Sequence, residues 1–428
     1  MNFTAPRARL RLRKFPYPYR ATLTILSDRH GVQSADEFRA FHKFLNTTAD
    51  TPHGRGLGLE IGDTFWFFDG SSRFSYFSNF TNTPSPQAPI IRDYYRAGYI
   101  DCLHTWGDFT DVPFERKYAQ WAVDESLKQS LQLPIWVNHG NRHNTQNLNF
   151  GISYHQGATL GSPSYHADLA RAAGLKFLWR SLTPVIGQDR PLHFREFVDL
   201  GNERDFRMST YAARQVAKRL AMAADRLLGT PLGWHEPYRD NRLLRPARLD
   251  DNQEVYEFHR FNNHATSVWD GMHAGDLVRQ IARPVIDALI KVEGYMIVYN
   301  HLEYGEFYHP DVISALRSVA LRQQAGDLWV TTTAQMFRYN LAHRHLSWQE
   351  KFDDEGGLTI VIDSSYSDPV LGATPVTAAD LEGLTFLVPK DSAAISFTLN
   401  GRTVPHVVFE RAPVGVIGFP VGRLMFPE

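Results

Sequence analysis

The sequence predicts an α/β protein in which a closed or distorted (β/α) barrel is followed by a small all-β module. Three observations support this prediction. Short apolar runs recur along residues 1–349 with room for a helix between them, and the character of the sequence changes near residue 350. A chain of 428 residues with 43% hydrophobic content can also bury a large core.

The barrel is predicted from apolar runs that are short enough to be buried strands. Runs of this length, separated by helical patterns, are typical of parallel βαβ units, and about seven or eight units make a (β/α) barrel. Two connecting helices are predicted, at residues 36–46 and 209–229. The runs themselves span residues 21–27, 56–62, 99–103, 133–138, 175–179, 254–261, 295–300 and 327–332.

Residues 350–428 predict a small β-rich module. Short β-branched runs alternate here with Gly, Pro, Asp and Asn, and Asn400-Gly401 is a strong hairpin signal. The predicted domains are therefore a barrel over residues 1–349 and the module over residues 350–428. Removal of a separate module would leave the barrel intact, unless the two bury a large apolar interface between them.

The composition narrows the class of partner. A formal net charge of -1 gives no electrostatic reason to expect nucleic acid or an anionic membrane. No stretch approaches 18 uninterrupted apolar residues, and the basic N-terminal segment has no apolar core of signal-peptide length, so we expect no membrane span and a cytoplasmic location. The single cysteine, Cys102, excludes an intrachain disulfide framework.

Ionisable side chains follow several of the predicted strands at the point where each strand ends. Loops at the carboxyl ends of parallel strands share one face of the sheet, so these side chains are expected to form a common polar site. They are Asp28 and His30 after the first run, His104 and Asp108 after the third, His139 after the fourth and His301 after the seventh.

The spacing of these residues points to a metal ion. His104 and Asp108 are four residues apart, so one helical turn would place imidazole and carboxylate on the same face. Asp28 and His30 project to the same side of an extended segment, where one could complete the ligand set and the other activate a water. The alternative is structural: Asp108 caps a turn, His104 is a hydrogen-bonded core histidine, and Asp28 pairs with Arg29.

Further residues are candidates for contact with a substrate. His139 precedes a glycine that allows close approach, and Asn138 and Asn141 could bind a sugar or acyl oxygen, or else form the turns of the loop. His301 could act as a general acid or be a hydrogen-bonded histidine at the rim. The aromatic stretch at residues 63–80, with Trp106 and Trp234, could stack on sugar rings or pack in the core.

These motifs together resemble those of the polysaccharide deacetylase superfamily, also called NodB-like or carbohydrate esterase family 4. The resemblance covers roughly residues 15–345 in order and spacing, and it implies a distorted (β/α)7-type barrel. It rests on "FPYPYRATLTILSDRHG", "DEFRAFHKFLN", "LHTWGDF" and "IVYNHLE". The family motif H-[ST]-x-x-H reads "HTWGD" here, and the Asp-Asp pair of the family reads "DRH".

The resemblance also implies roles for individual residues. Asp28 would be the catalytic base and His301 the general acid. The two motif changes exchange one ligand type for another, so a set of two histidines and one carboxylate remains for zinc or another first-row divalent ion. That set would be His30, His104 and Asp108, while Arg142 or His139 stands where the family carries an arginine.

The leading hypothesis is a metal-dependent hydrolase that removes an acyl group, most directly N-acetyl, from an amino sugar in a glycan. A second hypothesis is a catalytically silent homologue that binds carbohydrate. A third is a barrel-fold glycoside hydrolase, for which Glu236, Asp240 and Glu257 are the available acids.

Overall fold

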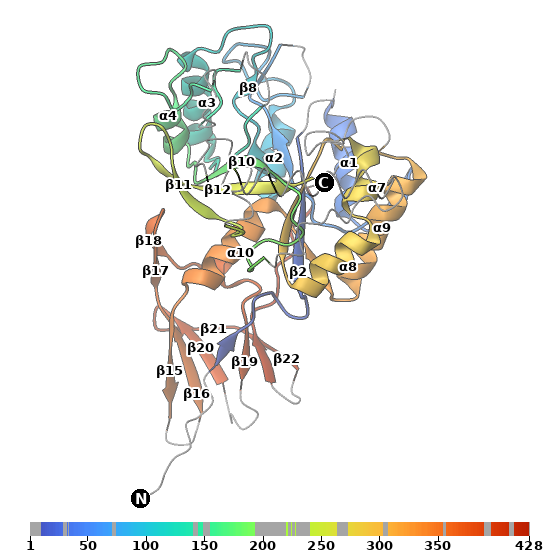
Figure 1. Ribbon diagram of the computed structural model, residues 1–428, viewed down its shortest axis with the longest axis vertical. Helices are drawn as coiled ribbons and strands as arrows, with labels where there is room; N and C mark the ends of the chain where they lie inside the picture. The colour runs from blue at the N-terminus through green and yellow to red at the C-terminus, as the bar shows by residue number, and fades with distance from the viewer. Residues whose placement is uncertain are drawn as a thin grey trace, which may run out of the picture.

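A computed structural model describes most of the chain (Figure 1). The described residues are 10–28, 32, 34–70, 74–139, 144–148, 155–192, 220, 224, 227, 240–262, 273–302, 307–353, 357–388, 395–410 and 415–427. The predicted helix at 209–229 lies almost entirely outside them. The architecture is mixed α/β, with a large parallel sheet and small antiparallel sheets toward the C-terminus.

The large sheet closes into a ring of parallel strands. Its strand order is β10-β9-β7-β5-β2-β13-β12, and β12 pairs again with β10 to complete the ring. Two further strands flank it: β14 (Leu328–Val330) lies parallel to the first half of β2, and β11 (Arg245–Arg248) lies antiparallel to β12. The ring strands are β2 (Ala21–Ser27), β5 (Asp63–Phe65), β7 (Ile100–Leu103), β9 (Ile135–Trp136), β10 (Phe177–Thr183), β12 (Glu254–Phe261) and β13 (Tyr295–Asn300).

Most of the predicted strands are confirmed, and the run at residues 56–62 is the exception. Every residue of β2 is buried, as expected for a parallel strand covered on both faces. Residues 56–62 form no strand, because their backbone donors bond to the end of helix α1. Leu57 N–H donates to the carbonyl of Phe44 and Leu59 N–H to that of Leu45, so the strand starts only at Asp63.

Helices pack on the outside of the ring (Figure 1). The predicted first helix is confirmed as α1 (Ala35–Asn46), which buries Phe38, Phe41 and Leu45. Ser34 caps its N-terminus, because the Ser34 hydroxyl accepts from Glu37 N–H. None of the helices in the described part of the chain has both the length and the apolar character needed to span a bilayer. The other helices among the described residues are α2 (Ala88–Ala97), α3 (Arg116–Gln129), α4 (Ala167–Ala172), η2 (Ala274–Asp276), α7 (Leu277–Gln280), α8 (Arg283–Val292), α9 (Pro310–Gln324), α10 (Thr333–His345) and α11 (Ala378–Leu381).

The C-terminal region consists of short strands, as predicted. In the turn between β20 and β21, Asn400 and Gly401 have φ values of 54° and 72°, which gives the expected tight hairpin. One sheet contains β15 (Trp348–Phe352), β16 (Leu358–Ile362), β20 (Ile395–Leu399) and β21 (Arg402–Val404), and another contains β1 (Arg11–Leu12), β19 (Thr385–Val388), β23 (Gly415–Gly418) and β22 (Val407–Glu410). Three small pairs are β17 (Ser365–Asp368) with β18 (Gly372–Pro375), β3 (Asp50–Thr51) with β4 (Gly54–Arg55), and β6 (Phe68–Asp69) with β8 (Gly107–Asp108).

The two ends of the chain cross the boundary expected near residue 350. The N-terminal strand β1 pairs with β19, and it lies beside the C-terminal strands in Figure 1. In the opposite direction, Leu424 N–H donates to the Glu60 carboxylate at 2.8 Å, and the Phe426 ring packs 5.6 Å from the Tyr94 ring. The β-rich region is therefore built from both termini and is tied to the ring.

Helix α10 joins the ring to the β-rich region through one continuous apolar core. Its Phe337 ring lies 4.8 Å from that of Phe177 and 5.0 Å from that of Phe258, inside the ring near the beginnings of the strands. The same core continues through Met336 to Phe386 of the β-rich region. The apolar interface between the two parts is therefore large, and removal of residues 350–428 would expose it.

We expect Phe337→Ala to destabilise the whole protein, because it opens a cavity in this shared core. The expected loss is about 3–5 kcal/mol in the free energy of unfolding, measured by urea denaturation. Leu321→Ala on α9 is the matched control, since that side chain is 64% exposed and its loss should cost less than about 0.5 kcal/mol. Equal effects of the two substitutions would contradict a continuous core.

A buried carboxylate accepts a hydrogen bond from the first turn of α10. Ala334 N–H donates to Asp101 Oδ2 at 2.8 Å, so a strand of the ring supplies the acceptor for the helix terminus. Burial raises the pKa of Asp101 to about 7, and the charge of Asp63 acts in the same direction. The folded protein therefore holds a proton that the unfolded chain, with an aspartate pKa of about 3.9, releases.

This difference gives a pH dependence of stability with a defined sign. Between pH 4 and 7 the folded state binds the extra proton, so Asp101 lowers the free energy of unfolding as the pH rises, by about 1.4 kcal/mol per unit. Asp101→Asn should remove this contribution, so its stability relative to wild type should increase from pH 5 to pH 7.5 in urea denaturation. Asp93→Asn on the surface is the control, and an identical pH profile for wild type and Asp101→Asn would refute the assignment.

Candidate active site

A buried ion pair lies at the carboxyl end of the ring. Asp28 follows β2 directly, and Arg260 is the penultimate residue of β12. Arg260 Nη1 donates to Asp28 Oδ1 at 2.6 Å and Nη2 to Oδ2 at 2.8 Å. The side chains are 0% and 1% exposed, so this is a fully desolvated, bidentate pair. The structural alternative is an ion pair of Asp28 with Arg29 or a neighbour; the described partner comes from a distant strand, and Arg29 lies outside the described residues.

Two aromatic rings hold the Arg260 guanidinium in place. Its Cζ atom lies 3.9 Å from the centroid of the Trp179 ring and 4.0 Å from that of Tyr299. The rings belong to β10 and β13, so four strands fix this one carboxylate. Sequence reasoning missed Arg260. The available signal was a charged residue within the apolar run 254–261, because a buried arginine requires an acidic partner.

His104 lies beside this pair, directly after β7. Its ring stacks on Trp66 at 5.6 Å and stands perpendicular to the His139 ring at 5.0 Å. Burial holds the pKa of His104 well below its usual range, and the nearby charges of His139, Arg260 and His301 act in the same direction. Because Nδ1 donates to the Val137 carbonyl at 3.3 Å, the neutral imidazole carries its lone pair on Nε2.

His139 has the opposite tautomer. The amide of Asn144 donates to His139 Nδ1. The orientation of this amide is fixed because its oxygen accepts from Phe109 N–H at 3.2 Å. The Nε2 atom of a neutral His139 therefore carries the proton, and it can donate to an oxygen. His139 and His104 thus place a donor and an acceptor side by side at the rim.

Asn138 and Trp106 belong to the scaffold, which corrects their prediction as substrate contacts. Asn138 Nδ2 donates to the Leu148 carbonyl at 2.8 Å, while its Oδ1 accepts from Trp136 and from Leu148 N–H. Trp106 is 0% exposed, and its Nε1 donates to His166 at 3.1 Å. Both side chains are used to hold the loop after β9. The aromatic stretch at 63–80 is likewise buried over most of its described length, which favours packing.

The helical turn predicted from His104 to Asp108 does not form. Thr105 adopts a φ of 55°, and Asp108 belongs to the short strand β8 instead. Asp108 Oδ1 accepts from both the N–H and the hydroxyl of Thr110, at 3.1 and 2.6 Å. The helical turn that would place these two side chains on one face is therefore absent, and Asp108 uses Oδ1 in a local turn, as in the structural alternative.

His301 lies at the end of β13, on the same rim. It forms a β-bridge with His273, and its ring lies 5.3 Å from that of Tyr299, which stacks on Arg260. His301 is therefore linked through the Tyr299 ring to the Asp28–Arg260 pair. The structure places His301 near the Asp28–Arg260 pair through Tyr299, and His104 against His139, with each residue after a strand of the ring.

Of the two histidines predicted to bind a metal ion, His104 is among the described residues. His104 fits a ligand role, because its buried imidazole is neutral and its Nδ1 is held by a backbone carbonyl. Within the described ranges, no three His, Cys, Asp or Glu side chains are grouped to hold an ion. The second predicted histidine ligand, His30, lies outside these ranges, as do Arg142 and Asn141.

The acids considered for a glycoside hydrolase are engaged elsewhere. Glu257 lies within β12 and forms ion pairs with Arg180 and Arg245, each at 3.8 Å. Both carboxylate oxygens of Asp240 accept from the Arg242 side chain. Glu236 and Trp234 are outside the described residues.

Comparison with known proteins adds no relative. Neither a family model, nor a curated protein, nor a solved structure matches this chain. The resemblance to polysaccharide deacetylases therefore rests on the sequence motifs alone.

Arg260→Met should reveal the strength of the buried pair, because it leaves the Asp28 carboxylate desolvated without a partner. We expect a loss of about 3–5 kcal/mol in the free energy of unfolding, and a smaller loss when Asp28→Asn is added. Arg248→Met is the control, since its pair with Glu254 is 69% exposed on the arginine side and should contribute less than about 1 kcal/mol. Strictly additive effects of the two site substitutions, in a double-mutant cycle, would argue against a direct pair.

Proposed function

We propose that this protein is a hydrolase that removes an acyl group, most directly N-acetyl, from an amino sugar of a glycan, on a distorted (β/α)7-type barrel. The observation that carries the proposal is the Asp28–Arg260 pair, which lies on one rim with three histidines from other strand ends. A carboxylate of fixed orientation beside imidazoles in two tautomeric states offers both proton acceptors and proton donors.

The proposed reaction is hydrolysis of an amide bond. Asp28 takes a proton from the attacking water, whose oxygen forms a bond to the acyl carbon. The bond between this carbon and the sugar nitrogen then breaks, and His301 donates a proton to the departing amine. Arg260 acts as a positioning residue, because it fixes both oxygens of Asp28. His139 donates its Nε2 proton to a substrate oxygen.

A divalent cation, zinc being the best match to imidazole ligands, would polarise the acyl carbonyl when bound. His104 is the described residue suited to hold it, and His30 is the second histidine proposed from the sequence. Asp108 is the proposed carboxylate ligand, and its Oδ1 also accepts from Thr110. The contribution of the chain itself is the neutral His104 imidazole, which burial keeps unprotonated.

The main alternative is a silent homologue that binds glycan without turnover. Both functions would use the same rim, so binding of a sugar alone does not distinguish them. Turnover and the metal content of the purified protein do, because a protein that only binds sugar has no need for an ion at His104.

Substitutions at the rim should separate proton transfer from metal binding. With an oligomer of N-acetylglucosamine as substrate, Asp28→Asn and His301→Ala should each lower the rate of acetate release by about 10²- to 10⁴-fold. Both variants should keep the metal content of the wild type, measured by elemental analysis, whereas His104→Ala should lose metal and activity together.

His53→Ala is the matched control for these experiments, because His53 is an exposed histidine of the loop between β3 and β4. It should behave as wild type in every assay. Acetate release by His301→Ala at the wild-type rate would exclude the proposed acid. A wild-type protein without metal and without turnover on acetylated sugars would favour the silent homologue.

A further inference from the structure

A second polar site lies at the opposite end of the ring. A groove of about 320 Å³ is lined by the segment around β1, by the residues that lead into β2 and by the end of α8. Arg20 immediately precedes β2 and Asp28 follows it. This strand has seven residues, so the groove and the rim are separated by about 20 Å. The groove is therefore distinct from the candidate active site.

The lining of the groove is strongly basic, although the whole chain has a net charge of -1. One acidic residue, Glu293, faces four cationic side chains, and its carboxylate lies 3.7 Å from Arg20. The cationic side chains are Arg11, Arg13, Lys14 and Arg20. An open groove with this excess of positive charge attracts anions.

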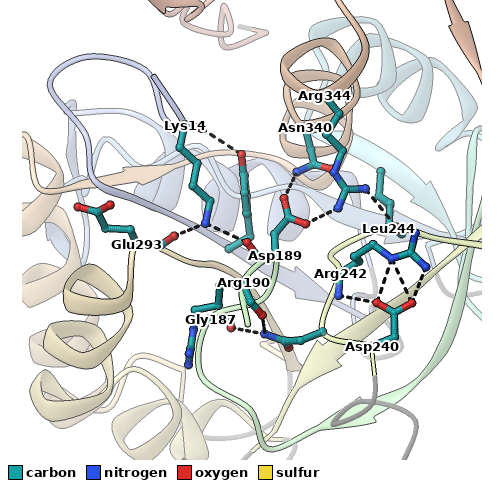
Figure 2. A network of polar contacts seen from close by, with 12 residues as sticks. Lys14, Gly187, Asp189, Arg190, Asp240, Arg242, Leu244, Glu293, Asn340 and Arg344 are labelled. Carbon is teal, nitrogen blue, oxygen red and sulfur yellow. Dashed lines mark hydrogen bonds and ion pairs between the residues drawn. The ribbon is translucent and has the colours of Figure 1, made fainter. Parts of the chain in front are cut away.

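Lys14 is held by neutral oxygens, and not by a carboxylate. Its Nζ donates to the carbonyl of Glu293 at 2.6 Å and to that of Asp189 at 3.0 Å (Figure 2). The Asp189 carboxylate is turned to helix α10, where it accepts from Arg344 and from Asn340 (Figure 2). Asp189 is therefore paired with Arg344, and the amino group of Lys14, whose pKa burial lowers from its usual value, is held at a fixed position by two carbonyl oxygens.

Arg13 is preorganised in a similar way. Its Nη2 donates to the carbonyl of Tyr19 at 3.2 Å, and its guanidinium lies 5.1 Å from the centroid of the Tyr17 ring. Arg11 and Arg13 are two residues apart along an extended segment, so both project to the same side. Cations that are fixed before a ligand arrives lose less entropy when they bind it.

From this arrangement we infer that the groove is a binding site for a small phosphate-bearing molecule. Guanidinium groups match the oxygens of phosphate in pairs, and a fixed lysine supplies a point charge. The volume is that of a small-molecule site, and Tyr19 lines the groove where the organic part of such a ligand would lie. Glu293 competes for Arg20 and would be displaced by the phosphate.

The test is a calorimetric titration of the full chain with pyrophosphate at low ionic strength. We expect saturable binding that weakens as salt is added, and a rise in melting temperature with pyrophosphate. Arg11→Gln and Arg20→Gln should each weaken binding by about three- to tenfold, because each removes one charge-assisted contact. Glu293→Gln should tighten it, since the competing carboxylate is lost.

Arg96→Gln is the matched control, because Arg96 is an exposed arginine of α2 away from the groove. It should bind pyrophosphate as wild type does, and all variants should melt within a few degrees of each other. Citrate, a carboxylate of comparable charge, should bind more weakly than pyrophosphate. The inference is overturned if pyrophosphate does not bind, if Arg96→Gln weakens binding as much as Arg11→Gln, or if citrate binds equally well.

Discussion

The Arg260–Asp28 ion pair is the interaction on which the carboxyl end of the ring depends. Two charges that are almost completely withdrawn from water are stable only when each satisfies the other in good geometry. The partners are 232 residues apart in sequence, so the pair forms only after β2 and β12 have joined the same sheet. The rings of Trp179 and Tyr299 then restrict the guanidinium to one position.

The two ends of the ring have opposite characters. At the end where the strands begin, Phe337 of α10 fills the interior and continues the core into the β-rich region. At the end where they finish, the interior carries charged and imidazole groups. The first end is closed by apolar packing, so the buried ion pair and the histidines lie at the second end. The cationic groove lies outside the ring, between β1 and the end of α8.

The β-rich region and the ring are connected through both ends of the chain. It takes its edge strand β1 from the N-terminus and returns the C-terminal residues Leu424 and Phe426 to the ring. Contacts between residues so far apart in sequence favour folding of the ring and the β-rich region as one cooperative unit. The cationic groove results from this arrangement, because β1 and the residue after it place Arg11 and Arg13 near the beginning of β2.

The sequence by itself determined the parallel α/β class, the β-rich character of the tail, the Asn400-Gly401 hairpin and the position of Asp28, His104, His139 and His301 at the ends of strands. These features follow from local periodicity and turn chemistry, which are properties of neighbouring residues. Only the tertiary structure decided that Arg260 is the partner of Asp28, that Asp108 shapes a turn and that Trp106 is buried. It also decided that residues 56–62 bond to α1 and that β1 joins the C-terminal sheet. The Asp108 turn is a local contact with Thr110 that forms in place of a helical turn. The others depend on which groups meet in the folded chain, and such partners leave no periodic pattern in the sequence.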